Sequence, residues 1–365
     1  MMLSISPGTF LMFAVAGLLL YLAIAKNCEP TLLLPIGFGT LLGNLPDSPL
    51  NHPGGMLYIL NEVGIKTELF PLFIFIGIGA LMDFRPLLSQ PVFALMGAAG
   101  QLGIFATLIL ATVIGFPLNH AASIAIIGAI DGPTSIYVSS LLAPELLAPI
   151  AVTAYSYMSL VPIIQPPLMR LLTTKAERRI RMEYAPRPVT RTAVIAFPII
   201  VTGVIGFLVP QSAPLISTLM LGNLLKESGV VQRLSNTAAN EITNFSTLFL
   251  GLTIGSLMQA ASFFRTQTLA ILLLGLGAFV LDTVAGILFG KVLAILTRGK
   301  INPLVGAAGI SAFPMSGRLV QKVALEEDFT NHVLMHAMGA NTAGQLGSVI
   351  AGGILLTLVT ALLKP

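Results

Sequence analysis

Apolar runs of the length that a bilayer requires recur along almost the whole chain, with only short polar stretches between them. One such run extends from about Thr9 to Ala25, another from about Pro91 to Phe116 and another from about Leu146 to Leu172. A helix needs about 20 consecutive apolar residues to cross the hydrocarbon core. Because a helix satisfies its own backbone hydrogen bonds, it is the element that can cross lipid repeatedly. The pattern therefore predicts an all-α polytopic membrane protein, with the lipid bilayer as its surroundings.

The composition excludes a water-soluble enzyme. Charged residues make up 9% of the chain and hydrophobic residues 55%, whereas soluble domains are about one quarter charged. The single cysteine, Cys28, leaves no internal disulfide. Nucleic-acid binding is not expected, because the basic residues have no folded domain to present them.

Basic residues gather in one short segment near the middle of the chain. More than a third of the 19 Lys and Arg residues fall there: Arg170, Lys175, Arg178, Arg179, Arg181, Arg187 and Arg191. Since short basic loops of membrane proteins stay on the cytoplasmic side, we expect residues 173–191 to be a cytoplasmic linker.

The sequence after this linker repeats the sequence before it. GTLLGN at 39–44 matches GNLLKE at 222–227, GALMD at 79–83 matches GSLMQ at 255–259, and GAIDGPTS at 128–135 matches GISAFPMS at 309–316. The chain is therefore divided into a first transmembrane repeat (1–172), the linker (173–191) and a second transmembrane repeat (192–365).

Each repeat has six apolar segments, one of which is short. Pro30–Leu45, interrupted by glycines, and its counterpart Ala213–Lys226 are read as re-entrant or half helices. Five crossings per repeat, joined by a short linker, place the two repeats in opposite orientation. This is the inverted-repeat plan of secondary transporters, with both termini outside.

The segment 121–143 carries the chemistry of the first repeat. Asp131 is followed by Gly132 and Pro133, which break a helix and free backbone carbonyls. A carboxylate at membrane depth is costly and marks an ion or substrate path. The matching segment 301–319 is the second broken helix, and we expect a cation site where the two breaks meet.

Neutral oxygens around one carboxylate favour sodium over a divalent ion. No group of His and Cys suits zinc. Ser135 and Ser159 have the alternative of bonding their own helix backbone. Asp282 has no broken helix near it in this interpretation, so a structural role is expected, and Glu241 falls in a polar surface or cavity segment (235–244). The candidate side chains are Asp131, Thr134, Ser135, Tyr155, Ser156, Tyr157, Ser159, Gln165, Asn302, Ser311, Ser316, Arg318, His336, Asn341, Thr342 and Gln345.

Four motifs together resemble one known family. DGPTSIY at 131–137, AYSYMSLVPIIQPP at 154–167, NPLVGAAGISAFPMSGR at 302–318 and HAMGANTAGQ at 336–345 are similar to the beta subunit of the sodium-pumping, biotin-dependent carboxylic-acid decarboxylases. That family comprises the oxaloacetate, methylmalonyl-CoA and glutaconyl-CoA enzymes.

The resemblance implies a membrane subunit that decarboxylates carboxybiotin on a carrier partner and couples this step to outward sodium transport with proton consumption. Its implied partners are a carboxyltransferase alpha subunit, a biotin carrier protein or domain, a small membrane subunit of gamma or delta type, and further copies of itself. Its implied location is the cytoplasmic membrane of a prokaryote.

The resemblance also implies site residues. Asp131, Ser311 and Asn341 would bind sodium, with Asn302, Tyr157 and Gly306 alongside. Tyr157, Arg318 and Asp131 would act in catalysis. Arg318 would hold the carboxybiotin anion or tune Asp131, and sodium binding at Asp131 and Tyr157 would displace a proton toward carboxybiotin. The competing hypothesis is a sodium-coupled secondary transporter, either a carboxylate symporter or a cation–proton antiporter, because the repeats and the buried Asp fit that class as well.

Overall fold

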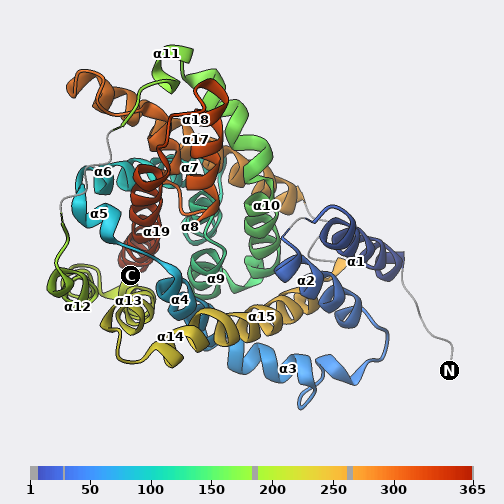
Figure 1. Ribbon diagram of the computed structural model, residues 1–365. Helices are drawn as coiled ribbons and strands as arrows, with labels where there is room; N and C mark the ends of the chain where they lie inside the picture. The colour runs from blue at the N-terminus through green and yellow to red at the C-terminus, as the bar shows by residue number, and fades with distance from the viewer. Residues whose placement is uncertain (1–6, 28, 183–187, 261–265, 364–365) are drawn as a thin grey trace.

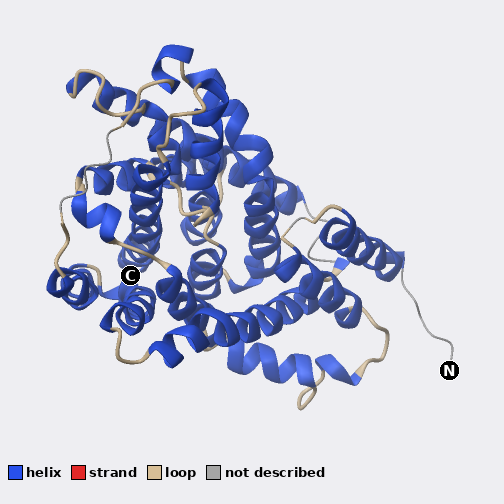
Figure 2. Cartoon of the chain, viewed as in Figure 1, coloured by secondary structure: helices blue, strands red, loops and turns tan. Residues whose placement is uncertain are grey.

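The computed structural model describes residues 7–27, 29–182, 188–260 and 266–363, and these residues form helices joined by turns, without strands (Figure 2). Six helical stretches of this part are long and apolar enough to cross a membrane, and a bent pair, Pro49–Ile65 with Leu69–Leu81, makes a seventh if it counts as one span. The six are Pro7–Ala25, Val92–Ile114, Pro144–Leu172, Arg191–Leu208, Thr266–Leu296 and Leu334–Leu363. The predicted all-α polytopic membrane protein is confirmed.

The elements are described in two groups, before and after the short helix α11. The first half contains α1 (Pro7–Ala25), α2 (Pro30–Gly43), η1 (Pro49–Asn51), α3 (Met56–Leu60), the π-helix η2 (Asn61–Ile65), α4 (Leu69–Leu81), α5 (Arg85–Ser89), α6 (Val92–Ala99), α7 (Leu102–Ile114), α8 (Leu118–Ala125), η3 (Ile126–Ala129), α9 (Gly132–Leu142), η4 (Pro144–Leu146) and α10 (Leu147–Leu172). After α11 (Lys175–Arg178), the second half contains α12 (Arg191–Leu208), η5 (Pro210–Ser212), α13 (Ala213–Ser228), α14 (Gln232–Thr237), the π-helix η6 (Ala238–Ile242), α15 (Thr243–Leu257), α17 (Thr266–Leu296), η7 (Pro303–Gly309), α18 (Met315–Glu327) and α19 (Leu334–Leu363).

The predicted helix Pro91–Phe116 is present as one span, Val92–Ile114, in which a turn at Gly100 and Gln101 separates α6 from α7. The polar segments 46–66 and 235–244 contain short helices and one π-helical turn each (η2 and η6).

The short helix of each half packs against a helix of the other half: α2 against α15, and α13 against α4. A Cβ on Gly39 of α2 would collide with the carbonyl of Leu252 in α15, and a Cβ on Gly222 of α13 would collide with that of Ile76 in α4. Gly39 matches Gly222 in the aligned repeats, and Ile76 matches Leu252.

A second pair of glycine contacts shows the same correspondence between the halves. Gly255 of α15 meets the carbonyl of Ile36, and Gly79 of α4 meets that of Leu219. Such backbone contact needs glycine, as at many membrane helix interfaces. These glycine contacts of one half therefore recur with the halves interchanged. The opposite orientation of the two repeats across the membrane stays a prediction.

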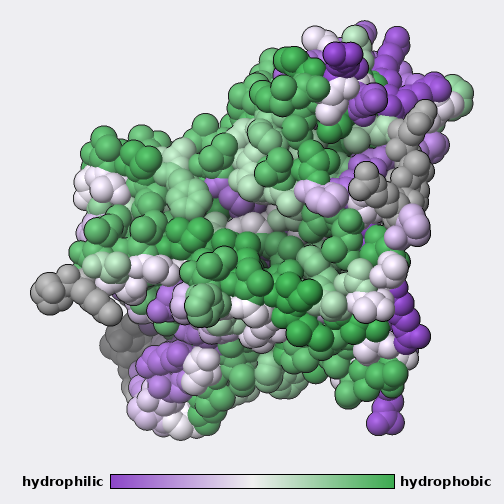
Figure 3. Space-filling view, turned by 90° about the vertical axis from the view of Figure 1, so that its left-hand side faces the viewer, coloured by the Kyte–Doolittle hydropathy of each residue, from purple (hydrophilic) through white to green (hydrophobic). Residues whose placement is uncertain are grey.

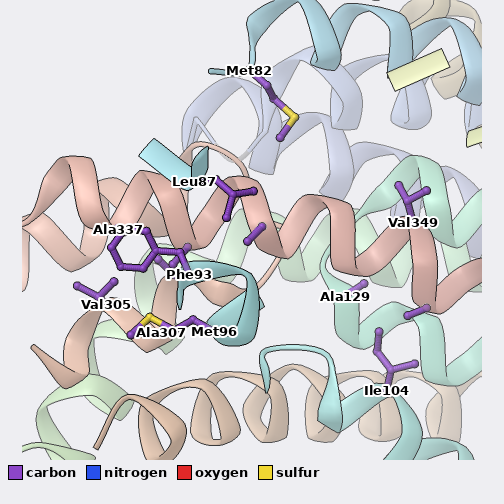
Figure 4. Packing of buried hydrophobic residues seen from close by; sticks show 14 of the residues in the cluster. Met82, Leu87, Phe93, Met96, Ile104, Ala129, Val305, Ala307, Ala337 and Val349 are labelled. Atoms are coloured by element: carbon purple, nitrogen blue, oxygen red, sulfur yellow. The ribbon is translucent and has the colours of Figure 1, made fainter. Parts of the chain in front are cut away.

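The helices form two packed groups (Figure 1). We call one the scaffold body, to which each half contributes its first three longer helices: α1, α2 and α4 from the first half and α12, α13 and α15 from the second. The other, the core body, contains α6–α10 and α17–α19 with both broken elements. Buried side chains of the two halves mix there, as Phe93 and Met96 do with Val305 and Ala307 (Figure 4).

Paired charges close one end of the core body. Arg178 of α11 is buried and bonds Glu327 of α18 at 2.9 Å, while Arg181 bonds Asp328 at 2.7 Å and Arg170 bonds Glu326 at 2.6 Å. We call these three pairs the polar cap. Hydrophilic side chains gather at the top of the molecule, the end where α11 and α18 lie, above a broad hydrophobic surface (Figures 1 and 3).

Candidate functional site

The first break is formed as predicted. The 3-10 helix η3 ends at Ala129, Ile130 takes a left-handed conformation (φ 53°, ψ 42°), and α9 starts at Gly132 with Pro133 in its first turn. Asp131 lies between them as the N-cap of α9 and is 3% exposed. A carboxylate at this position satisfies free amides and faces the positive end of the helix dipole.

Three side chains donate to one oxygen of this carboxylate. Oδ2 of Asp131 accepts from Thr134 Oγ1 at 2.6 Å, from Gln345 Nε2 at 2.7 Å and from Ser348 Oγ at 2.8 Å. Its Oδ1 has a single longer bond, from the Thr134 amide at 3.4 Å. The buried charge is thus stabilised from both α9 and α19, and Oδ1 is the oxygen that is left with spare acceptor capacity.

The two breaks meet directly. The backbone amide of Ser311, in the second break between η7 and α18, donates to the carbonyl of Ala129 at 3.1 Å. The Ser311 hydroxyl donates to Gly344 of α19 at 2.9 Å. The expected meeting of the two broken helices is therefore present.

One face of α19 holds both breaks. Asn341 donates to the carbonyls of Ala308 and Ile310 at 3.1 and 2.7 Å, while Gln345 and Ser348 hold Asp131. Residues 341, 345 and 348 are four and three apart, so they share a helix face. Sequence reasoning named Asn341 and Gln345 but missed Ser348, which this spacing could have found.

A second residue that the sequence reasoning missed is Gln101. Its Nε2 donates to the carbonyls of Gly309 and Gly344 at 3.2 and 3.3 Å, so the turn between α6 and α7 supports the second break. A lone Gln after a glycine, in a stretch expected to be one unbroken helix, gave no signal of this contact.

Other predicted site residues lie away from Asp131. The Tyr157 hydroxyl donates to the carbonyl of Leu272 in α17. Asn302 caps η7 and donates to the carbonyls of Arg178 and Ile180 at 3.1 and 2.9 Å, next to the polar cap. Gly306 lies against the backbone of Gly286 in α17, which leaves no room for a side chain. These three residues join the second break and α10 to their neighbours, and none of them bonds Asp131.

Arg318 is exposed in the first turn of α18, just after the second break. Among the residues that the structure describes, none forms a hydrogen bond or ion pair with its guanidinium, so it does not tune Asp131 by direct contact. A free guanidinium at this place is suited to bidentate binding of a carboxylate.

The remaining candidates divide into two groups. Gln165 donates to the Ala307 carbonyl at 2.8 Å and accepts from Ser316 at 3.0 Å, so it supports the second break. Ser159 bonds the carbonyl of Ser156 in its own helix, the alternative interpretation. Ser135 bonds the carbonyl of Asp131 at 2.9 Å and also that of Ile126, across the first break, at 3.4 Å.

The expectation that Asp282 has no broken helix near it was wrong. A Cβ on Gly128, three residues before Asp131, would lie 2.9 Å from its Oδ2. Because Asp282 lies in a continuous apolar helix, α17, its local sequence did not indicate this tertiary contact with η3.

The junction offers oxygen ligands with one negative charge. Asp131 supplies the carboxylate, and the buried Oδ1 of Asn341 has no hydrogen-bond partner. No group of three or more His, Cys, Asp or Glu side chains that could hold a metal ion occurs within the described ranges. Such a donor set suits a singly charged hard cation better than calcium or zinc.

These features define a class: a multi-pass helical membrane protein with a buried carboxylate where two broken helices meet. Residues 8–359 match the family described as the Na⁺-transporting oxaloacetate decarboxylase beta subunit. The chain belongs to this family and is a decarboxylase beta subunit, part of a multi-subunit complex, which sets aside the secondary transporter.

Three relatives illustrate the match. The glutaconyl-CoA decarboxylase subunit beta of Acidaminococcus fermentans is 50% identical over 353 residues, covering 96% of this chain and 93% of that protein. The methylmalonyl-CoA decarboxylase subunit beta of Veillonella parvula is 48% identical, covering 98% and 95%. The oxaloacetate decarboxylase beta chain of Klebsiella pneumoniae is 44% identical, covering 99% and 97%.

Proposed function

We propose that this subunit decarboxylates carboxybiotin presented by a carrier partner and uses the step to drive sodium outward, consuming a proton. The observation that carries the proposal is the junction at which Asp131, the second break and one face of α19 come together. A buried carboxylate held at a helix break is the arrangement that membrane pumps use for ions.

Sodium is the cargo of this site. Asp131 would contribute its negative charge through Oδ1, the oxygen with one long hydrogen bond, while Thr134, Gln345 and Ser348 keep Oδ2 in place. Asn341 would add its unpartnered Oδ1, and Ser311 would turn its hydroxyl from Gly344 toward the ion. A closure of α19 on the two breaks would bring these oxygens together.

Arg318 would bind the carboxylate of carboxybiotin. Its exposed guanidinium lies in the first turn of α18, the helix whose last turn contributes Glu326 and Glu327 to the polar cap. Carboxybiotin supplies a carboxyl group that leaves as carbon dioxide once the ureido nitrogen is protonated. Arg318 would orient this anion, and the apolar surroundings would limit water.

The proton needs a source in the protein. We propose that Tyr157 takes part, although its hydroxyl bonds the Leu272 carbonyl in this conformation, so the bond between α10 and α17 must open first. Tyr157→Phe tests this role. An unchanged decarboxylation rate with unchanged sodium dependence would exclude it.

Partners are expected because the family consists of beta subunits of decarboxylases. We propose a carboxyltransferase alpha subunit, a biotin carrier protein or domain and a small membrane subunit of gamma or delta type, with several beta subunits in one complex. The complex would reside in the cytoplasmic membrane of a prokaryote, with the polar cap and linker 173–191 in the cytoplasm.

The decisive experiment is reconstitution of the complete complex in vesicles. Sodium uptake is measured while oxaloacetate, methylmalonyl-CoA or glutaconyl-CoA is supplied in turn. Uptake that requires one of these acids, together with a biotinylated partner that co-purifies on streptavidin, is expected. Sodium movement without a biotinylated partner or an added acid contradicts the proposal.

A further inference from the structure

Asp282 is a second acidic residue buried in the core body. It lies in α17, is 0% exposed, and accepts a hydrogen bond on Oδ1 from the backbone amide of Gly103. Gly103 is the second residue of α7, so this oxygen caps the helix that starts after the Gly100–Gln101 turn. One half of the carboxyl group is therefore accounted for.

The second oxygen of the carboxyl group has no such hydrogen bond. Oδ2 of Asp282 is buried without a hydrogen-bond partner. It lies on the side of Gly128, where an added Cβ would be 2.9 Å from Oδ2 and 2.7 Å from the Cβ of Ala278. Gly128 belongs to η3, the segment that leads into Asp131. An ionised carboxylate with a bare oxygen in apolar surroundings is costly, so this oxygen calls for a proton or a cation.

The corresponding position at the second break provides a comparison. Gly309, which matches Gly128, is approached by Gln101, whose amide donates to its carbonyl. One break is thus bonded by a permanently neutral amide, while the other lies against an acid. Because Gln has no protonation equilibrium, of these two groups only the acid beside the break that carries Asp131 can change its charge.

We propose that Asp282 is a proton-binding site of the transport cycle and that its charge controls how α17 packs against the first break. The proposal rests on the sodium-pump function above. A sodium ion needs several oxygen ligands, and the single unpartnered oxygen of Asp282 is not such a set. A proton needs only the one oxygen.

Charge links this site to Asp131. Gly128 and Asp131 are three residues apart, at most about 11 Å of extended chain. Two ionised carboxylates around one break repel each other, so sodium bound at Asp131 would favour proton release from Asp282. Sodium binding and proton release would then occur together.

Few other charged groups face Asp282. The elements α6, α7, η3 and η7, which pack on α17, contain no titratable side chain. The other two neighbours of α17 contain a few titratable side chains: His120 in α8, which bonds Glu145 and Gln267, and Tyr155, Tyr157 and Arg170 in α10. The other titratable residue of α17 itself is Lys291, which pairs with Glu177. None of these elements contributes another acid, and Asp131 follows three residues after Gly128, the residue of the first break that lies against Asp282.

A hydrophobic carbodiimide tests the proposal on the assembled complex in vesicles, because this reagent modifies protonated carboxyl groups shielded from water. Dicyclohexylcarbodiimide is added between pH 6 and 8, with and without sodium, and adducts are located by peptide mass spectrometry. We expect an adduct on Asp282 that decreases at least fivefold from pH 6 to 8 and decreases on addition of sodium. In Asp131→Asn, the effect of sodium on labelling should disappear.

Asp282→Asn provides the second measurement. Asn retains an acceptor for the Gly103 amide but binds no proton, so we expect a flattened pH profile of sodium-stimulated decarboxylation and at least a tenfold lower rate. Asp328→Asn, at the polar cap, is the matched control and should retain the wild-type profile.

No labelling of Asp282 at pH 6, or a wild-type pH profile in Asp282→Asn, overturns the proposal and leaves the carboxylate as a cap of α7. Failure of the sodium-pump function would instead appear as absence of sodium-stimulated decarboxylation in the unaltered complex.

Discussion

Replacing Asp131 by Asn separates the charge of the site from its shape. The side-chain oxygen of Asn can take the place of Oδ2 and accept the same three hydrogen bonds, now 2.6–2.8 Å long, from Thr134, Gln345 and Ser348. Its amide nitrogen would then face the Thr134 amide, so the one bond of 3.4 Å is lost. Loss of this one long hydrogen bond to a charged group costs at most about 1.5–3 kcal/mol, so the protein should remain folded.

The effect on sodium is much larger. Two unit charges about 4 Å apart attract each other by about 4 kcal/mol at an effective dielectric constant of about 20. Since about 1.4 kcal/mol corresponds to a factor of ten, the sodium concentration for half-maximal activity should rise roughly 10³-fold.

The assay is decarboxylation by the assembled complex as a function of sodium concentration, at constant ionic strength. Thermal unfolding in detergent is followed in parallel, and Asp328→Asn, which removes a carboxylate at the surface, serves as control. Wild-type half-saturation in Asp131→Asn would refute the assignment of the cation to this carboxylate. A folded variant that no longer responds to sodium would support it.

Four further predictions follow from other contacts. Ser348→Ala removes one hydrogen-bond donor to a charged group, worth about 1.5–3 kcal/mol. In the same assay it should raise the sodium concentration for half-maximal activity about tenfold or more. Gly222→Ala places a Cβ against a backbone carbonyl and should destabilise the protein by about 1–3 kcal/mol in thermal unfolding, whereas Gly17→Ala, with nothing within 4 Å, should not. The Thr330 hydroxyl and Arg181 lower the pKa of Asp328 to about 2. A lowered pKa gives stability that is present above the unfolded value of about 3.9 and lost toward the folded value, so the stability difference between Asp328→Asn and wild type should stay constant from pH 8 to 5 and vanish toward pH 2. Cysteines introduced in the linker 173–191, with Cys28 replaced, should react with a membrane-impermeant maleimide only from the cytoplasmic side; reaction from outside would contradict the predicted orientation.

Local sequence signals were sufficient for the breaks and for the repeat. Gly132 and Pro133 after Asp131 determine where α9 starts, because proline fits the first helical turn and disrupts a helix interior. The repeat was visible because glycines that permit backbone contact stand at matching places in both halves. These features depend on a few neighbouring residues, so the sequence displays them.

Contacts between distant segments were less accessible. The partnership of Asp131 with Gln345 and Ser348 spans more than two hundred residues, and no local pattern pairs them. Tyr157 and Asn302 were placed at the cation site by resemblance, yet their side chains bond Leu272 and the linker end in this conformation. No local sequence pattern indicated the contacts of Asp282, because the residues beside it, Gly103 and Gly128, are glycines without side chains.

The glycine contacts between α2 and α15 and between α13 and α4 are those of an isologous dimer, in which residue i of one copy meets residue j of the other and the reverse. A chain of half this length, meeting a second copy of itself, would find every one of these contacts available. Duplication and fusion of its gene would then require no new interface, only a linker. Once the two copies were joined, each break became free to acquire its own residues, and the acid at the first break and the neutral amide at the second record that divergence.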